Sequence, residues 1–303
     1  MSHLQVSKFA SLTGHKDSLY ALATGLTEKE VFSSGADGMI VQWNVDNPDL
    51  GKLVAKVPNP VYALHLNSDK KLVVGQNFEG IHIIDPIAGK EEKSLKLSAT
   101  AIFDIQESKG HYFIAMGDGE LLKIEKDQLI ITSRIKLSEK SARCIAINEK
   151  KGLLAVGYSD FQIRVFTLDE LKLVNTIQAH QNSVFTLAFS PDGIYLLSGS
   201  RDARINIWET ENNFSLNQSI VAHMYAVNHI SFSRDGRYFA SCSMDKSVKI
   251  WDAHAFKLLK VIDKARHAGH GTSVNKLLWL NYNNYIVSCS DDRTLSVWHL
   301  MQE

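Results

Sequence analysis

The residues of this 303-residue chain that are best suited to catalysis are a histidine, a serine and an aspartate. They recur at constant spacing, each time followed by a tryptophan. A serine, a histidine and an aspartate together can form the catalytic triad of a hydrolase, in which the histidine activates the serine hydroxyl. A triad occurs once in an enzyme, whereas this set occurs four times. The recurrence therefore favours a structural role over catalysis. The four sets are His15, Ser33, Asp37 and Trp43; His180, Ser198, Asp202 and Trp208; His223, Ser241, Asp245 and Trp251; and His270, Ser288, Asp292 and Trp298.

The tryptophans belong to a repeat of about forty residues that runs through the whole chain. Alignment on them gives spacings of 41, 40, 42, 42, 43 and 47 residues between Trp43, Ile84, Ile124, Phe166, Trp208, Trp251 and Trp298. A second marker, an apolar residue followed three residues later by another, keeps the same step at Leu19, Val61, Ile102, Ala142, Val184, Val227 and Val274. Because two separate markers stay in step, the sequence predicts seven repeats.

The elements that must position these residues are short strands. Each repeat consists of apolar and polar residues in alternation, bounded by turns such as Pro-Asp-Gly at 191–193 and Arg-Asp-Gly at 234–236. No segment shows sustained helical periodicity. Four short antiparallel strands in each of seven repeats predict an all-β fold, the seven-bladed β-propeller. We expect one such unit over residues 1–303, with its blades centred on the seven aligned positions.

Several stretches identify a family. They are "GHKDSLYAL" with "FSSGADGMIVQW", "AHQNSVFTL" with "LSGSRDARINIW", "SCSMDKSVKIWD", and "GHGTSVNKL" with "SCSDDRTLSVW". Their pattern resembles that of WD-repeat propellers, and the resemblance covers essentially the whole chain. It implies that each tryptophan N–H donates to the serine hydroxyl, which bonds the histidine, which bonds the turn aspartate. The set would then be a buried structural relay.

The resemblance also implies how the ring closes. The chain stops five residues after Trp298, one strand short of a complete blade, and it begins with a spare strand, "LQVSKFASL". In the family, such an N-terminal strand completes the last blade. We therefore expect residues near 4–12 to pair beside the strand that ends at Trp298.

The other three repeats depart from the relay. Repeat two is apolar at all four positions, with Val57, Val74, Phe78 and Ile84. Exchanging every partner of a buried network together can be nearly neutral. Repeats three and four keep Asp118 and Asp160, which we expect to cap their own turns. They have Ile124 and Phe166 in place of tryptophan, and Ser98 and Ser138 in place of histidine.

In WD-repeat proteins, the narrower face carries the loops that enter the innermost strands and the turns before the third strands. Of the seven positions just after the second marker, which flank this face, four are aromatic, and an arginine lies between Phe103 and Phe185. Aromatic residues and arginine dominate binding hot spots, and aromatic rings could also clamp a cation. The alternative is that the rings plug the channel. The sequence predicts a partner-binding rim at Tyr20, Tyr62, Phe103, Arg143 and Phe185, with Arg201 and Met244 at its margin.

No catalytic or cofactor motif is evident. A phosphate-binding loop, a zinc-protease signature, an EF-hand loop and a nucleophile elbow are all missing from the sequence. His267 and His270 have the spacing of metal ligands, but His270 belongs to a relay set, so we predict no metal and no cofactor. The loop at 263–273 is longer than its counterparts and basic, with Lys264 and Arg266, and could recognise an acidic partner.

Composition narrows the function class. Lysine plus arginine equals aspartate plus glutamate at 33 each, which argues against a general nucleic-acid or anionic-membrane binder. Three cysteines without framework spacing fit a reducing compartment, and no apolar run is long enough to span a membrane. We predict a monomeric, cytoplasmic, non-catalytic scaffold for protein or peptide partners. The alternatives are an enzyme or small-molecule binder that uses the channel, and an RNA- or ribosome-associated protein.

Overall fold

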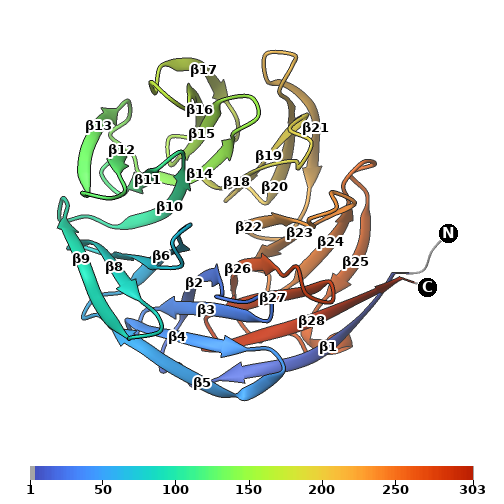
Figure 1. Cartoon of the computed structure of the whole chain (residues 1–303). Coiled ribbons are helices and arrows are strands. Elements are labelled where there is room, and N and C mark those ends of the chain that lie inside the picture. The colour runs from blue at the N-terminus through green and yellow to red at the C-terminus, as the bar shows by residue number, and fades with distance from the viewer. Residues whose placement is uncertain (1–3, 303) are drawn as a thin grey trace.

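The computed structural model describes residues 4–302, so residues 1–3 and 303 of the predicted unit lie outside it. Within this range the strands form seven four-stranded antiparallel sheets, arranged as the blades of a ring (Figure 1). The predicted seven-bladed propeller is therefore confirmed. Each innermost strand begins at the second sequence marker, from Leu19 in blade one to Val274 in blade seven.

The first four blades follow one another along the chain. Blade one contains β2 (Leu19–Thr24), β3 (Glu30–Gly35), β4 (Met39–Asn44) and β5 (Asn47–Lys56). Blade two contains β6 (Val61–Leu66), β7 (Leu72–Gln76), β8 (Gly80–Asp85) and β9 (Lys90–Lys96). Blade three contains β10 (Ile102–Ser108), β11 (His111–Met116), β12 (Glu120–Glu125) and β13 (Ile130–Lys136). Blade four contains β14 (Ala142–Asn148), β15 (Leu153–Tyr158), β16 (Gln162–Thr167) and β17 (Leu173–Gln178).

The last three blades complete the ring. Blade five contains β18 (Val184–Phe189), β19 (Tyr195–Ser200), β20 (Arg204–Glu209) and β21 (Ser215–Val221). Blade six contains β22 (Val227–Phe232), β23 (Tyr238–Ser243), β24 (Val248–Asp252) and β25 (Leu258–Ile262). Blade seven contains β26 (Val274–Trp279), β27 (Tyr285–Ser290), β28 (Thr294–Gln302) and the N-terminal β1 (Leu4–Thr13).

A short helix, α1 (Lys264–His267), lies in the long loop between β25 and β26. The Asp263 carboxylate caps it by accepting from the Arg266 N–H at 2.8 Å and also pairs with the Arg266 guanidinium at 2.7 Å. One of the basic residues of this loop thus has its counter-ion within the loop. No helix in the part of the chain that the structure describes is long and apolar enough to cross a membrane.

Ring closure joins the two ends of the chain. β1 pairs antiparallel with β28, from Leu4 opposite Gln302 to Thr13 opposite Thr294. In Figure 1 the two ends of the described chain lie side by side. The Leu12 side chain is fully buried in a cluster with residues of blades seven and one. The predicted closure of the last blade by the N-terminal strand is confirmed.

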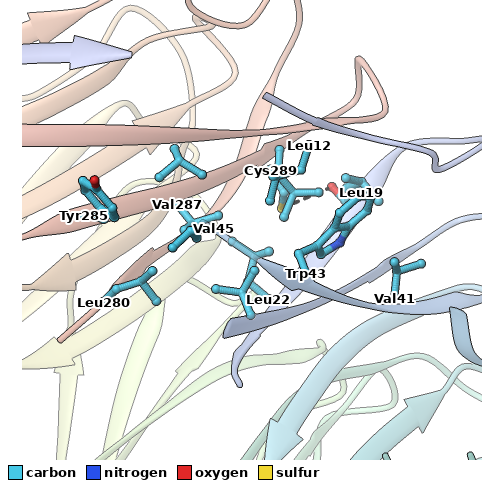
Figure 2. Packing of buried hydrophobic residues seen from close by; sticks show 13 residues of the cluster. Leu12, Leu19, Leu22, Val41, Trp43, Val45, Leu280, Tyr285, Val287 and Cys289 are labelled. Carbon is cyan, nitrogen blue, oxygen red and sulfur yellow. Dashed lines mark hydrogen bonds between the residues drawn. The ribbon is translucent and has the colours of Figure 1, made fainter. Parts of the chain in front are cut away.

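The core lies between the blades. Figure 2 shows the cluster between blades seven and one, in which Trp43, Val287 and Cys289 are buried together. Six more clusters each join two adjacent blades. Full burial of an apolar side chain stabilises a fold by about 1.5–3 kcal/mol. Contacts between blades therefore contribute a large stabilising free energy to the ring.

One position on each second strand is small and buried in every blade: Ser34, Gly75, Ala115, Gly157, Gly199, Cys242 and Cys289. A Cβ at Gly157 would lie 2.7 Å from the Cγ1 of Val184, which begins the innermost strand of the next blade. Small residues here let adjacent blades approach closely. Two of the cysteines occupy this column, and all three cysteines of the chain are free and buried.

The four recurrent sets form one hydrogen-bond chain in four blades. In blade one, the Trp43 indole N–H donates to Ser33 Oγ at 2.8 Å, Ser33 Oγ lies 2.7 Å from His15 Nε2, and His15 Nδ1 lies 2.9 Å from an Asp37 oxygen. The corresponding distances in blades five, six and seven lie between 2.8 and 3.0 Å. The histidines and serines are buried, so the chain leaves none of these polar atoms without a partner.

The relay aspartate also shapes the backbone. Asp202 accepts from the Gln181 and Arg204 backbone N–H groups, both at 3.0 Å. Ala203, which lies between Asp202 and Arg204 in the sequence, adopts a left-handed conformation with φ of 67°. The carboxylate thus ties the loop that enters the innermost strand to a strained turn before the third strand.

The blades without the relay use other contacts. Asp118 and Asp160 each accept from the backbone N–H two residues on, and Asp160 also pairs with the Arg164 guanidinium at 2.8 Å. In blade two, Val57, Val74 and Ile84 are buried. Phe78 does not join them, because it has a φ of 65° and is 57% exposed. The apolar substitute for the relay therefore involves three positions, not four.

Deleting residues 1–12 should lower the melting temperature by at least about 10 °C, because the deletion removes the β1–β28 ladder and exposes the cluster around Leu12. Ser11→Gln, an exposed change on the same strand, should leave melting unchanged. Circular dichroism melting of both variants is the measurement. An unaltered melting curve for the deletion would contradict this account of closure.

Replacing Ser198 by alanine should lower the free energy of unfolding by about 1–3 kcal/mol, because the Trp208 N–H and His180 Nε2 lose their common partner. Ser34 is the matched control, since it is also buried on a second strand but its hydroxyl has no hydrogen-bond partner. Ser34→Ala should change stability by less than about 0.5 kcal/mol. Urea unfolding measures both variants, and equal losses would contradict the relay's role.

The relay predicts that acid destabilises the fold. Burial lowers the pKa of His15 and His223, although their aspartates oppose it. Burial raises the pKa of Asp202, but the His180 hydrogen bond and charge, together with the hydrogen bonds from the Gln181 and Arg204 backbone, outweigh it and bring the value to about 2. At each of these groups the unfolded chain binds more protons than the folded one, so stability falls as the pH falls.

Urea unfolding from pH 7.5 to pH 3 should show a loss that begins near the ordinary histidine pKa of about 6.5 and continues below about pH 4 as aspartates protonate. The slope between pH 7 and pH 5 should be shallower for His223→Gln, which removes one of the titrating groups. A stability that stays constant or rises from pH 7.5 to pH 5 would contradict the expected direction of this pH dependence.

Candidate functional site

The predicted rim lies on the face where two kinds of loop meet, which we call the narrow face. In all seven blades, the residue before the position of the turn aspartate (Asp37 in blade one) donates its backbone N–H to a carbonyl at 2.8–3.1 Å. The carbonyl belongs to the residue before the innermost strand of the same blade. Ala36 and Ser18 form this contact in blade one, and Asp291 and Ser273 form it in blade seven. The turns between second and third strands therefore flank the mouth of the channel.

The channel is a cavity of about 800 Å³ lined by the innermost strands of all seven blades. Five of the seven predicted rim residues line it, and we call them the rim arc: Tyr20, Tyr62, Phe103, Arg143 and Phe185. Each is the second residue of its strand, and each keeps part of its surface exposed. The register of the innermost strands thus places five large side chains next to one another at the mouth of the channel.

The aromatic rings of the arc contact one another across blades. The Tyr20 and Tyr62 ring centroids are 5.0 Å apart with the rings edge to face, and Tyr62 stacks on Phe103 at 5.8 Å. Such pairs add about 0.5–1.5 kcal/mol beyond their burial. The rings are therefore held in place before any partner arrives.

Arg143 lies between two of these rings. Its guanidinium carbon is 4.1 Å from the Phe103 ring centroid and 4.8 Å from that of Phe185. Cation–π attraction and planar stacking favour this arrangement. Burial lowers the pKa of Arg143 below its ordinary value, and the charge of Arg201 acts in the same direction.

The opposite side of the mouth is polar and has a structural role. The Asn228 amide donates to the Val274 carbonyl at 2.8 Å. The Asn275 amide donates to the Leu19 carbonyl at 2.8 Å and to an Asp291 carboxylate oxygen at 2.7 Å. These two asparagines occupy the positions equivalent to the rim arc, but their amides bind the next blade.

Titratable and polar groups deeper in the channel also bind neighbouring blades. Asp104 accepts from the Ile145 N–H at 2.8 Å, and His229 Nδ1 accepts from the Leu277 N–H at 3.4 Å. Among residues 4–302, no group of three or more histidine, cysteine, aspartate or glutamate side chains could hold a metal ion. His270, one of the spaced histidines, hydrogen-bonds Ser288 and Asp292 in its relay.

The two marginal residues lie apart from the cavity. Arg201 and Met244 are exposed on their turns and do not line the channel. Met244, which is 51% exposed, lies beside two apolar residues that the sequence reasoning missed, Met224 at 80% and Tyr225 at 59% exposure. The Met244 N–H donates to the Ala226 carbonyl, which brings the three together on blade six.

The sequence does carry a signal for these missed residues. Met224 follows the relay histidine of its repeat, whereas the equivalent positions hold Lys16, Gln181 and Gly271. Large apolar residues after this histidine therefore distinguish blade six. Phe78 was also missed as a rim residue, and it lines the channel on blade two.

Comparison with known proteins places the four relay repeats in a family. The family model described as "WD domain, G-beta repeat" matches residues 7–44, 171–209, 214–252 and 261–299, about half of the chain. These are the four repeats that contain the complete relay. Blades two and three and the first three strands of blade four lie outside the matched segments.

Two relatives and one solved structure extend the likeness. The chain is 21% identical to striatin of Mus musculus over 234 residues, or 69% of this chain and 30% of striatin. It is 25% identical to the periodic tryptophan protein 2 homolog of Mus musculus over 229 residues, or 68% of this chain and 25% of that protein. The chain thus matches less than a third of the length of these relatives.

The crystal structure of the WD40 β-propeller domain of Doa1 superposes with a TM-score of 0.85 at 19% identity, covering 97% of this chain and 96% of that domain. This similarity supports the fold. With the family model matching the relay repeats, the chain belongs to the WD40 repeat family of β-propellers.

Proposed function

We propose that this propeller is a non-catalytic scaffold that binds a protein or peptide partner through the rim arc on its narrow face. The observation that carries the proposal is the difference between the two sides of the channel mouth. Asn228 and Asn275 join blades through their amides. Within residues 4–302, the rings of Tyr62, Phe103 and Phe185 make ring contacts only with other arc residues, and all three stay partly exposed.

The composition of the arc suits a protein partner. Tyrosine, phenylalanine and arginine bury much area with few rotatable bonds, and hot spots are enriched in tyrosine and arginine. The exposed Met224, Tyr225 and Met244 extend the apolar surface over blade six of the same face. A partner that enters the channel mouth could therefore also contact this second patch.

The absence of catalysis is part of the proposal. The channel lining includes the acid–base groups Asp104, His229 and His65. A general base needs a free lone pair within reach of substrate. Asp104 and His229 instead accept hydrogen bonds from a neighbouring blade's backbone, and His65 Nε2 lies 3.6 Å from a Glu107 carboxylate oxygen.

We further propose a monomeric protein of the cytoplasm that does not bind nucleic acid. The ring is closed by two segments of one chain, β1 and β28, so closure needs no second copy. Three free cysteines fit a reducing compartment. A net charge of zero disfavours a polyanionic partner.

Affinity purification with mass spectrometry tests the rim. Tyr62→Ala/Phe103→Ala/Phe185→Ala should lose the partners that the wild type retains. The matched control is Leu50→Ala/Ile87→Ala/Leu216→Ala, which removes three exposed apolar side chains away from the channel. Melting curves establish that both variants are folded. Retention of the same partners by both variants would show that the rim arc is not the contact surface.

A further inference from the structure

The Arg143 guanidinium is a positive charge without a counter-ion. Within residues 4–302 it makes no hydrogen bond and no ion pair, although the residue is half-buried at the channel mouth. Arg164, another arginine that lies over an aromatic ring, pairs with Asp160 at 2.8 Å. Removing a charge from water without a partner is unfavourable. The position of Arg143 therefore fits a group that is completed by a ligand.

The two phenylalanine rings restrict how a ligand can reach this charge. The guanidinium carbon lies 4.1 Å from the Phe103 ring centroid and 4.8 Å from the Phe185 ring centroid. The N–H donors of a guanidinium all lie in its plane. An acceptor therefore reaches this group along its edge. A planar group with two oxygens matches that edge and can bind in a bidentate manner.

The charges around the mouth give the ligand a direction. Burial raises the pKa of the Tyr20 phenol, and the nearby carboxylates Asp291 and Asp17 act in the same sense. Asp291 and Asp17 thus lie on the Tyr20 side of the mouth. Arg143 and Arg201 lie on the other side, where the deeper Asp104 accepts a hydrogen bond from the Ile145 N–H. An anionic ligand would be repelled from the first side and attracted to the second.

We infer that the rim arc receives an aspartate or glutamate side chain of a partner polypeptide, with its carboxylate on the edge of Arg143. This inference rests on the proposed function and names the chemistry of the partner. A carboxylate carries one negative charge, which matches the positive charge of Arg143, because Arg201 does not line the cavity and Lys276, the other lining cation, lies on blade seven, across the ring from blade four. Apolar residues next to the acid would pack on Tyr62, Phe103 and Phe185.

The test begins with a phage-displayed library of random twelve-residue peptides, panned on the immobilised full chain. The retained peptides should share an aspartate or a glutamate at one position beside an apolar residue. One such peptide is then synthesised in its acidic form, in an amide form with glutamine or asparagine at that position, and with phosphoserine there. Calorimetry measures its binding to the wild type, to Arg143→Gln and to Arg234→Gln, a variant of an exposed arginine on the turn between β22 and β23.

Arg143→Gln should weaken binding of the acidic peptide by about tenfold or more, the size expected for a charge-assisted hydrogen bond. The amide peptide should bind the wild type more weakly by a similar factor, and the two changes together should weaken binding no further. Arg234→Gln, the matched loss of an exposed arginine outside the narrow face, should change binding less than twofold. Should Arg143→Gln fail to fold, the amide peptide on the wild type still decides the point.

Several results would overturn the inference. Peptides that need the arc aromatics but contain no shared acid, or that bind Arg143→Gln as well as the wild type, would refute the carboxylate while leaving the proposed function intact. Tighter binding of the phosphoserine form by tenfold or more would replace the carboxylate by a phosphate. Peptides that bind Tyr62→Ala/Phe103→Ala/Phe185→Ala unchanged, or a library that yields none, would count against both proposals.

Discussion

The pairing of β1 with β28 is the contact on which the rest of the ring depends. It joins segments almost 300 residues apart, so it is formed against a large loss of chain entropy. Once the ring is closed, every blade has a neighbouring blade on each side, and every interblade cluster is covered by a blade on both sides. The small buried residues at one shared position of the second strands, Gly157 and Gly199 among them, then determine how closely neighbouring blades approach. The width of the channel follows from these contacts.

The sequence predicts the scaffold well because the scaffold is periodic. A Trp208 or an Asp202 is informative since the same residue recurs one step away, and each recurrence tests the register again. Phe78 shows where this reasoning fails. Its repeat has a left-handed residue one position earlier than the other turns, and that shift turns the side chain out of the core. Nothing in the spacing of the repeat reveals a change confined to one turn.

The site is predictable only in part, for a related reason. Strand register alone places Tyr20, Tyr62 and Phe103 at the channel mouth, and the sequence provides that register. Whether Arg143 has a counter-ion depends on side chains from several blades, which no local pattern specifies. The same holds for Asn228 and Asn275, whose amides contact backbone carbonyls of the following blade.

The three cysteines have a practical consequence for the dynamics of this ring. Cys144 lies between blades four and five, Cys242 between six and seven, and Cys289 between seven and one. Burial raises the pKa of each thiol, that of Cys289 to about 12, so the reactive thiolate is suppressed while the blades are together. A thiol reagent will therefore modify each cysteine only when its own interface opens. The modification rates therefore report how often the interfaces between blades seven and one, four and five, and six and seven open transiently, without any engineered label.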